Sequence, residues 1–301
     1  GLQGIHTRQI GLMAQMHEAF ARHGIGVGQV LLTRSDFDDR VRFLNIRNCL
    51  THLHGLGCVP VLNENDTVAV EEIRFGDNDL LAALICNALR ADALLLLTVV
   101  DGLLDARGEV IDLVEDVGEH RALADGGSAW GSGGMASKLE AARRVVEAGE
   151  LAVIASGREP DVLPRLMGGE KLGTVFVPGS RKLDSRQRWI GLTARAGGTL
   201  TVDAGAVRAL TQGGKSLLAS GITQVTGHFE RGSVVRVRDE EGREVARGLC
   251  NYEADELRRI QGRRSEEFEQ LLGRSAYAEV IHRDNLVVQA GARRPRAGSE
   301  T

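Results

Sequence analysis

The chain has 301 residues, 43% of them hydrophobic, and a formal net charge of −4. This length can hold one large domain or two ordinary ones with an extensive core, and the near-balanced charge argues against a protein whose main task is to grip a nucleic-acid backbone. No apolar run approaches the roughly 20 residues that span a bilayer, and no basic-then-apolar signal pattern opens the sequence.

Cysteine usage points to a reducing compartment. The four cysteines show no C-x-x-C spacing, so the sequence indicates neither a zinc site nor a disulfide framework. They are Cys49, Cys58, Cys86 and Cys250. We therefore expect a soluble protein of the cytoplasm without a membrane partner.

The front part of the chain alternates predicted helices with apolar strands. Helical periodicity is found at 10–20, 37–56, 80–89 and 138–148, and β-branched apolar runs are found at 27–33, 59–62, 93–100, 151–155 and 174–177. Because these strands are apolar almost throughout, we expect an α/β fold whose parallel sheet is buried by helices on both faces.

Beyond Trp189 the sequence changes to Gly-Gly turns and short alternating runs. The alternation at 199–202, 233–238 and 244–249 predicts strands, and the polar turn at 239–242 joins the last two into a hairpin. This part of the chain is expected to form a small β domain.

Two polar clusters flank the junction between a predicted strand and a predicted helix. Asn63-Glu64-Asn65-Asp66 follows the apolar run 59–62, and Gly76-Asp77-Asn78-Asp79 precedes the helix at 80–89. Carboxylates and amides at the carboxyl edge of an α/β sheet can hold an ammonium group or a metal ion. One acid or amide could instead simply cap the helix, but two clusters exceed what a cap needs.

A glycine-rich segment meets a lysine where a predicted helix begins. Gly131-Ser132-Gly133-Gly134-Met135-Ala136-Ser137 leads to Lys138, a combination that can hold a phosphate through backbone N–H groups, the helix dipole and a mobile cation. The spacing matches neither the P-loop nor the dinucleotide pattern. A flexible linker is the alternative interpretation, although a linker has no need for the lysine.

Taken together, these segments resemble the glutamate 5-kinases of the amino acid kinase family, over nearly the whole chain and in the same order. The segments that carry the resemblance are 59–66, 75–79, 94–98 and 133–138, with further likeness at 28–34, 42–45 and 187–190. The segments 225–232 and 282–284 resemble the PUA domain that ends these proteins.

The resemblance implies ATP-dependent phosphorylation of the γ-carboxylate of L-glutamate to γ-glutamyl phosphate, the first step of proline biosynthesis, with Mg²⁺ assisting. Asp79 would orient the catalytic lysines, and Lys138 would stabilise the transferred phosphoryl group. The implied glutamate-binding residues are Asn63, Asp66, Asp77 and Asn78. The implied nucleotide-binding residues are Thr98, Val99, Gly133, Gly134, Met135 and Lys138. No side chain is assigned to a metal ion.

The resemblance also implies a domain plan. We expect a three-layer kinase domain at 1–190, a β-barrel-like PUA domain at 191–285 and a disordered tail at 286–301. The family further implies homo-oligomers and feedback inhibition by proline.

The sequence departs from the family pattern in two places. The sequence given contains neither the Lys-Leu-Gly-Thr-Ser loop, which supplies a phosphate-binding lysine, nor the Ser-Ser-Gly-Ala turn. We therefore expect a fragment that lacks the first strands and is inactive or poorly folded by itself. Val99 stands where the family usually has an acidic residue, and the segment after Leu104 is shortened. Both of these latter changes are expected to alter ATP affinity.

Two other functions are compatible with parts of the sequence. Another amino acid kinase is the nearest enzymatic alternative, but the segment from Trp189 into the PUA region disfavours it. The chain could also be an RNA-binding PUA protein with a vestigial kinase domain, because several arginines lie between 236 and 264. These arginines alternate with Glu and Asp, so a solvated mixed-charge face is favoured instead.

Overall fold

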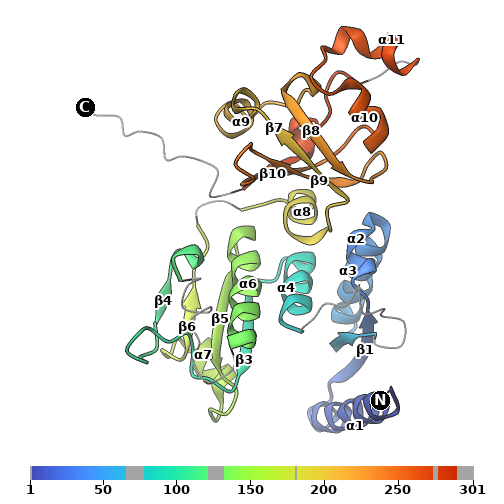
Figure 1. The fold of residues 1–301 in the computed structure, drawn as a ribbon. Coiled ribbons are helices and arrows are strands. Elements are labelled where there is room, and N and C mark those ends of the chain that lie inside the picture. The colour runs from blue at the N-terminus through green and yellow to red at the C-terminus, as the bar shows by residue number, and fades with distance from the viewer. Residues whose placement is uncertain (1, 66–77, 121–131, 180–181, 274–276, 290–301) are drawn as a thin grey trace. The chain divides into compact units, whose positions relative to one another are not determined.

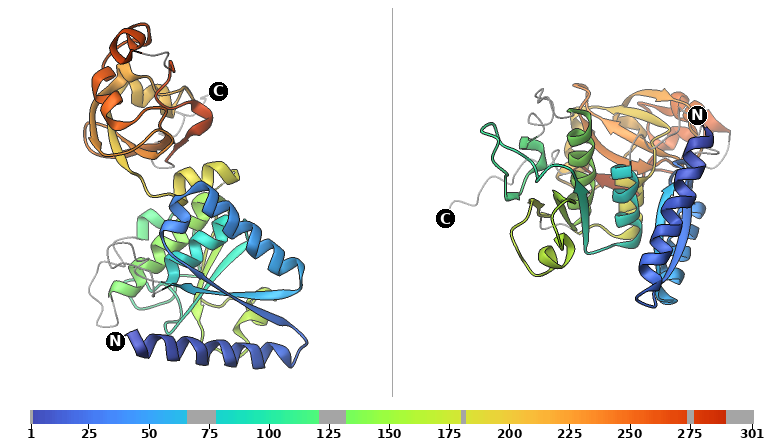
Figure 2. Two further views of the ribbon diagram at one scale, coloured as in Figure 1. Left: turned by 90° about the vertical axis from the view of Figure 1, so that its right-hand side faces the viewer. Right: turned by 90° about the horizontal axis from the view of Figure 1, so that it is seen from below.

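The computed structural model describes residues 2–65, 78–120, 132–179, 182–273 and 277–289, which form two compact units (Figures 1 and 2). The units are Gly1–Leu183 and Asp184–Thr301. The division therefore precedes the predicted domain boundary at 190, and the segment that contains Trp189 groups with the second unit.

The first unit opens with a helix and a two-stranded parallel sheet. Its elements are α1 (Leu2–Ala21), β1 (Gly26–Leu32), α2 (Ser35–Asp38), α3 (Arg40–Gly55) and β2 (Cys58–Glu64). The pairing of β1 with β2 runs from Gly26 opposite Cys58 to Leu32 opposite Glu64. The helix predicted at 37–56 is in fact two, because Asp39 adopts an extended backbone and its side chain caps α3 by accepting the Arg42 N–H.

A four-stranded sheet and its helices make up the rest of the first unit. The elements are α4 (Asn78–Leu89), β3 (Ala93–Thr98), β4 (Leu113–Val114), η2 (Val117–His120), α6 (Ser132–Ala148), β5 (Leu151–Ser156), α7 (Val162–Met167) and β6 (Thr174–Phe176). The sheet order is β3-β5-β6-β4.

The expected α/β fold is confirmed, but the strands of the first unit depart from a single parallel sheet in two respects. The described strands of this unit form two sheets, and β6 runs antiparallel to β5 while β3 with β5 and β4 with β6 are parallel. The chain turns back into β6 at Gly173, where φ is +73° and an added Cβ would lie 2.1 Å from the Ile154 carbonyl oxygen. Only glycine fits this close approach. The predicted burial on both faces also fails for the first sheet, since β2 is only partly buried throughout.

Helices α4 and α6 pack side by side over the four-stranded sheet (Figure 1). Small residues on α6 make this close approach possible, because Ala141 and Ala142 are fully buried there. They share a core with Ala83 and Cys86 of α4 and with Ile154 of β5. This packing fixes the starts of the two helices relative to each other.

The second unit is built on one five-stranded sheet with the order β11-β10-β9-β7-β8. Its strands are β7 (Gly198–Val202), β8 (Ile222–Gly227), β9 (Val234–Arg238), β10 (Glu244–Leu249) and β11 (Leu286–Val288). Its helical segments are α8 (Ser185–Arg188), η3 (Trp189–Thr193), α9 (Ala204–Thr211), η4 (Ala219–Gly221), α10 (Ala254–Ile260), η5 (Ser265–Glu267), α11 (Phe268–Leu272) and η6 (Arg283–Asn285).

The predicted hairpin of the second unit is confirmed, and two strands are additional. β9 and β10 pair antiparallel across the 239–242 turn. Neither β8 nor β11 was predicted as a strand. The disordered tail predicted at 286–301 begins too early, because β11 pairs with β10 and its three residues are buried; residues 290–301 lie outside the described residues. Among the helices that the structure describes, none combines the length and apolar character needed to cross a membrane.

Candidate active site

A carboxylate on α4 and a lysine on α6 form an ion pair at the starts of these two helices. Asp79 lies in the first turn of α4, and the Lys138 Nζ donates to its Oδ2 over 2.7 Å. Both side chains are mostly buried, with 18% of Asp79 and 16% of Lys138 exposed. Because water screens such a pair only partly, its charges act strongly on any group bound beside it. The structure thus brings together the two residues that were predicted to act in catalysis.

Ser137 reaches the same carboxylate, and the sequence reasoning missed it. Its Oγ lies 3.1 Å from Asp79 Oδ2 and 3.0 Å from the carbonyl oxygen of Gly134. Its position beside Lys138 was the only available signal, since a serine on a helix is ordinarily a solvent-facing residue.

The predicted glycine loop is the beginning of a helix. Helix α6 starts at Ser132, so Gly133, Gly134 and Met135 occupy its first turn and Lys138 its second. Glycine disfavours a helix interior by only about 1 kcal/mol, and the packing of α6 outweighs this cost. Among the described residues, no atom lies within 4 Å of a Cβ added at Gly134, so this part of the chain leaves room for a ligand beside the turn. The first-turn N–H groups of a helix have no partner within it and favour an anion.

The residues expected to bind glutamate are placed only in part. Asn63 is half-buried near the carboxyl end of β2, and Asn78 is the exposed first residue of α4. Because α4 packs against β2, these two amides lie on contacting elements. Asp66 and Asp77 lie outside the described residues.

Two of the residues expected to bind the nucleotide, Thr98 and Val99, lie at the carboxyl end of β3. Thr98 is the last residue of that strand, opposite Ser156 of β5, and its carbonyl oxygen accepts the Gly157 N–H over 2.7 Å. The next residue, Val99, is 65% exposed. Thr98 and Val99 therefore lie at a sheet edge of the kind that receives ligands in α/β folds.

A cavity of about 270 Å³ opens at the carboxyl end of β5. Ser156 and Gly173 line it together with Asp101, Asp112 and Glu159. Lys171 also lines the cavity and pairs with Asp112 over 3.7 Å. The lining still carries three carboxylates against one lysine, so its charge disfavours a phosphate group.

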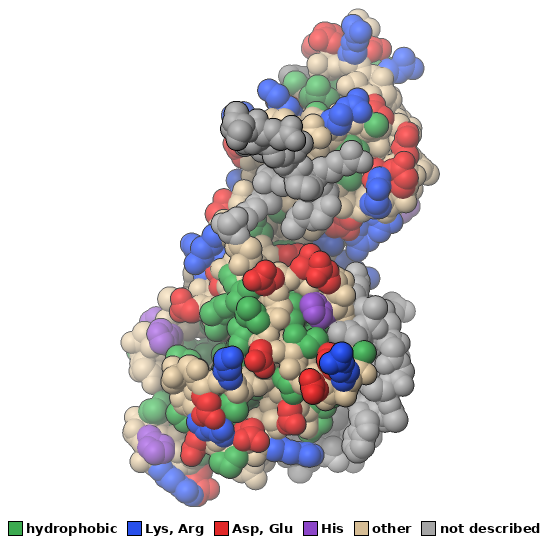
Figure 3. All heavy atoms as spheres, turned by 90° about the vertical axis from the view of Figure 1, so that its left-hand side faces the viewer, with side chains coloured by type: hydrophobic (Ala, Val, Ile, Leu, Met, Phe, Trp, Pro, Cys, Tyr) green, Lys and Arg blue, Asp and Glu red, His purple; other side chains and the backbone are tan. Residues whose placement is uncertain are grey.

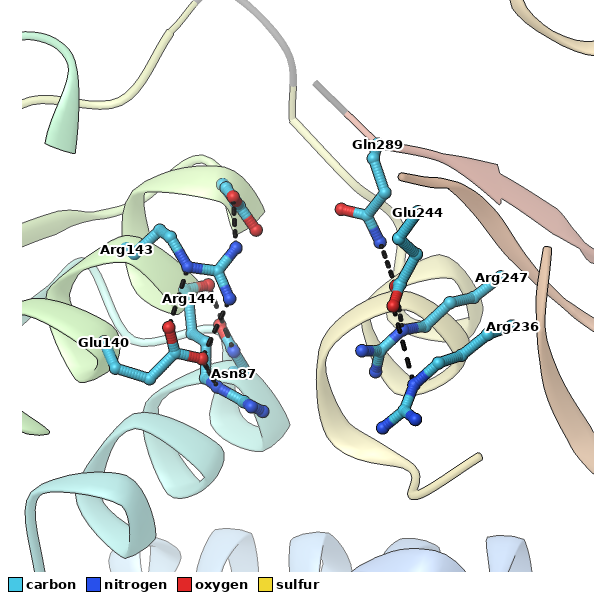
Figure 4. A network of polar contacts seen from close by, with 9 residues as sticks. Asn87, Glu140, Arg143, Arg144, Arg236, Glu244, Arg247 and Gln289 are labelled. Carbon is cyan, nitrogen blue, oxygen red and sulfur yellow. Dashed lines mark hydrogen bonds and ion pairs between the residues drawn. The ribbon is translucent and has the colours of Figure 1, made fainter. Parts of the chain in front are cut away.

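A half-buried polar network on α6 also reaches α4 through one hydrogen bond (Figure 4). Arg143 and Arg144 both bond to Glu140, and Arg143 also bonds to Glu147. Asn87 of α4 donates to the Arg144 carbonyl oxygen over 3.4 Å. Burial would raise the pKa of Glu140, but bonds and positive charge from the two arginines outweigh it and lower this pKa from 4.5 to about 2.

The fold and the site together define an amino acid kinase joined to a PUA domain. The sequence model of the amino acid kinase family matches residues 5–156. The sequence model of the PUA domain matches residues 198–272. The structure of a carbamate kinase from Giardia is similar to part of this chain. The match covers 58% of this chain and 72% of the carbamate kinase, with 18% sequence identity and a TM-score of 0.43.

Curated relatives narrow this class to one family. A glutamate 5-kinase of Chromohalobacter salexigens is 49% identical over 287 residues, which cover 93% of this chain and 76% of that protein. A glutamate 5-kinase of Caldanaerobacter subterraneus is 45% identical, with coverage of 92% and 77% respectively. The chain belongs to the glutamate 5-kinase family.

Proposed function

We propose that the chain transfers the γ-phosphoryl group of ATP to the γ-carboxylate of L-glutamate, giving γ-glutamyl phosphate for proline biosynthesis. The observation that carries this proposal is the mostly buried Asp79–Lys138 pair in a member of the glutamate 5-kinase family. Phosphoryl transfer depends mainly on positioning and on charge stabilisation, and this pair supplies a cation that a carboxylate holds ready before the nucleotide binds.

In the proposed reaction Lys138 stabilises the negative charge that spreads over the oxygens of the transferred group. The first turn of α6, with Gly133, Gly134 and Met135, would receive the phosphates through backbone N–H groups. The open space around Gly134 and the cationic Lys138 fit a nucleotide at this position. Mg²⁺, when bound, would neutralise phosphate charge and is usually held by nucleotide phosphates together with water.

Glutamate would bind along the edge between β2 and α4. An amide side chain can donate to the α-carboxylate, and a carboxylate can receive the α-ammonium group. Asn63 and Asn78 are therefore assigned to the α-carboxylate side, and Asp66 to the ammonium group. Asp77 is assigned to the same substrate.

The nucleotide side of the site has an unusual residue at Val99. Its side chain is exposed at the end of β3, where an acidic residue could accept a hydrogen bond from the nucleotide. We expect Val99→Asp to lower the KM for ATP, and Val99→Ala to leave it unchanged. Initial rates at saturating glutamate measure both values, and an unchanged KM in Val99→Asp would rule out the contact.

RNA binding by the second unit is not favoured. Several of its described arginines are paired with carboxylates: Arg236 and Arg247 with Glu244, Arg243 with Asp239, Arg258 with Asp255, and Arg263 with Glu267. On the face drawn in Figure 3, basic and acidic side chains are interspersed. A phosphate backbone needs a continuous basic surface with available charges, and these pairs compete with it.

Two accompanying properties rest on the family resemblance, and a third, location in the cytoplasm, rests on the cysteines. Proline would inhibit at or near the glutamate site, and the protein would form homo-oligomers. The four cysteines form no disulfide, which supports a reducing compartment such as the cytoplasm.

A substrate panel tests the proposed reaction. The product of the natural gene is given ATP and Mg²⁺ with L-glutamate, L-aspartate, N-acetylglutamate or carbamate, and ADP release is followed. We expect release to depend on L-glutamate. Release that depends instead on one of the other acceptors would identify a different amino acid kinase activity.

A further inference from the structure

Ser137 has two alternative acceptors for a single proton. Its Oγ lies 3.0 Å from the Gly134 carbonyl oxygen on its own helix and 3.1 Å from Asp79 Oδ2 on α4. A serine hydroxyl has one O–H and can donate to only one acceptor at a time. Rotation about the Cβ–Oγ bond therefore moves the donated hydrogen bond from one helix to the other without breaking a covalent bond.

The second acceptor is the oxygen that also receives Lys138. The Lys138 Nζ lies 2.7 Å from Asp79 Oδ2. In the proposed reaction Lys138 turns toward the γ-phosphoryl group, which weakens its bond to Asp79. Loss of a hydrogen-bond donor costs free energy when the carboxylate is mostly buried. This cost would oppose the movement of the lysine. A second donor within reach of the same oxygen reduces the cost.

We propose that Ser137 is a positioning residue that supports Asp79 while Lys138 engages the γ-phosphoryl group. Before the nucleotide binds, the lysine occupies Asp79 and the hydroxyl can donate to the Gly134 carbonyl oxygen. As the lysine moves, the hydroxyl donates to Asp79 Oδ2. This role rests on the proposed function. Ser137 would act through Asp79 and would not contact the substrate.

A local structural role is the competing explanation. Serine and threonine side chains often bond to a carbonyl oxygen one turn back in their own helix, and Ser137 could do no more than this. Thr211 on α9 makes only such a bond, with its Oγ1 donating to the Val207 carbonyl oxygen over 2.8 Å. Thr211→Ala is therefore the matched control for the loss of a back-bonding hydroxyl.

The test compares Ser137→Ala, Ser137→Thr and Thr211→Ala in the product of the natural gene. We expect Ser137→Ala to lower kcat about tenfold, the scale of one hydrogen bond to a charged group, with an unchanged KM for glutamate. Ser137→Thr keeps the hydroxyl and should restore kcat to within about twofold, and Thr211→Ala should match the wild type.

Nucleotide affinity, measured by calorimetry with Mg²⁺, provides the second readout. Ser137→Ala should weaken binding of the β,γ-imido analogue of ATP more than binding of ADP, because only the analogue has the γ-phosphoryl group. In an Asp79→Asn background the same substitution should no longer change the affinity for the analogue.

The outcomes separate this role from the proposed function. Wild-type kcat in Ser137→Ala, or an equal loss of analogue affinity with and without the Asp79 carboxylate, would overturn the role alone. A wild-type protein that neither binds nor turns over the nucleotide would overturn the proposed function and this role with it.

Discussion

At the scale of single residues, the chemistry depends on the Asp79 carboxylate and the donors around it. The sequence indicates Asp79 and Lys138, because an acid at one helix start and a lysine after a glycine-rich segment both suit phosphate chemistry. Their 2.7 Å contact joins positions 59 residues apart in the chain, and local patterns do not encode such a distance. Ser137 was missed for the same reason, since its significance comes from a neighbour on another helix.

Replacement of the lysine is the sharpest test at this scale. We expect Lys138→Ala to lower kcat by about 10²- to 10³-fold, the usual loss when a group that stabilises transition-state charge is removed. Glutamate-dependent ADP release measures it. Lys215→Ala removes an exposed lysine of the second unit and serves as the control; equal kcat values in the two variants would exclude a role for Lys138.

At the scale of elements, the α4–α6 packing holds the ion pair in place, and the Glu140 network stabilises α6. The pKa of Glu140 in the folded protein, about 2, lies below its ordinary 4.5. The unfolded chain therefore binds more protons between these values, so the network's stabilisation is present above pH 4.5 and is lost as pH falls toward 2.

The corresponding prediction concerns the variant Glu140→Gln. At pH 7 we expect its free energy of unfolding to fall by about 1 to 2 kcal/mol, less than the full shift implies, because the side chain is 34% exposed and solvent screens it. Urea unfolding followed by circular dichroism should show this difference shrinking between pH 4.5 and pH 3. Glu109→Gln, at an exposed glutamate of the same unit, is the control. A difference independent of pH would contradict the assignment.

The turn into β6 gives a second prediction for an element. Gly173→Ala would place a Cβ against the Ile154 carbonyl oxygen at a positive φ, so we expect the free energy of unfolding to fall by at least about 2 kcal/mol. In Gly179→Ala, no atom of the described residues lies within 4 Å of the added Cβ, so this variant should change stability little. Thermal unfolding of the two variants measures both effects, and equal midpoints would disprove the steric argument.

Most described strands and the four longest described helices could be predicted, whereas the short helices and the pairing of the strands could not. Apolar periodicity indicates where β3, β5 and α4 lie, because each is apolar over its own length. The antiparallel pairing of β6 depends on the close approach at Gly173, and the break between α2 and α3 depends on one capping aspartate, Asp39. β8 has a burial pattern in which only Ile222 and Val225 are buried, so its sequence shows no strict alternation.

At the scale of the whole molecule, the two units are assigned different roles, and different observations support each assignment. The first unit contains the Asp79–Lys138 pair and the strand ends, which the proposed function connects to phosphoryl transfer. The second unit is a PUA domain in which several described arginines pair with carboxylates, which favours a role within the enzyme over capture of RNA. The order of motifs along the chain was enough to suggest the family, because each motif is local in sequence.

Trapping of the product tests the central claim most directly. An acyl phosphate reacts with hydroxylamine, so the natural gene product, incubated with ATP, Mg²⁺, L-glutamate and hydroxylamine, should form γ-glutamyl hydroxamate in step with ADP. The yield should require L-glutamate and fall to background in Lys138→Ala. ADP release without γ-glutamyl hydroxamate, or an undiminished yield in Lys138→Ala, would contradict phosphorylation of the γ-carboxylate at this site.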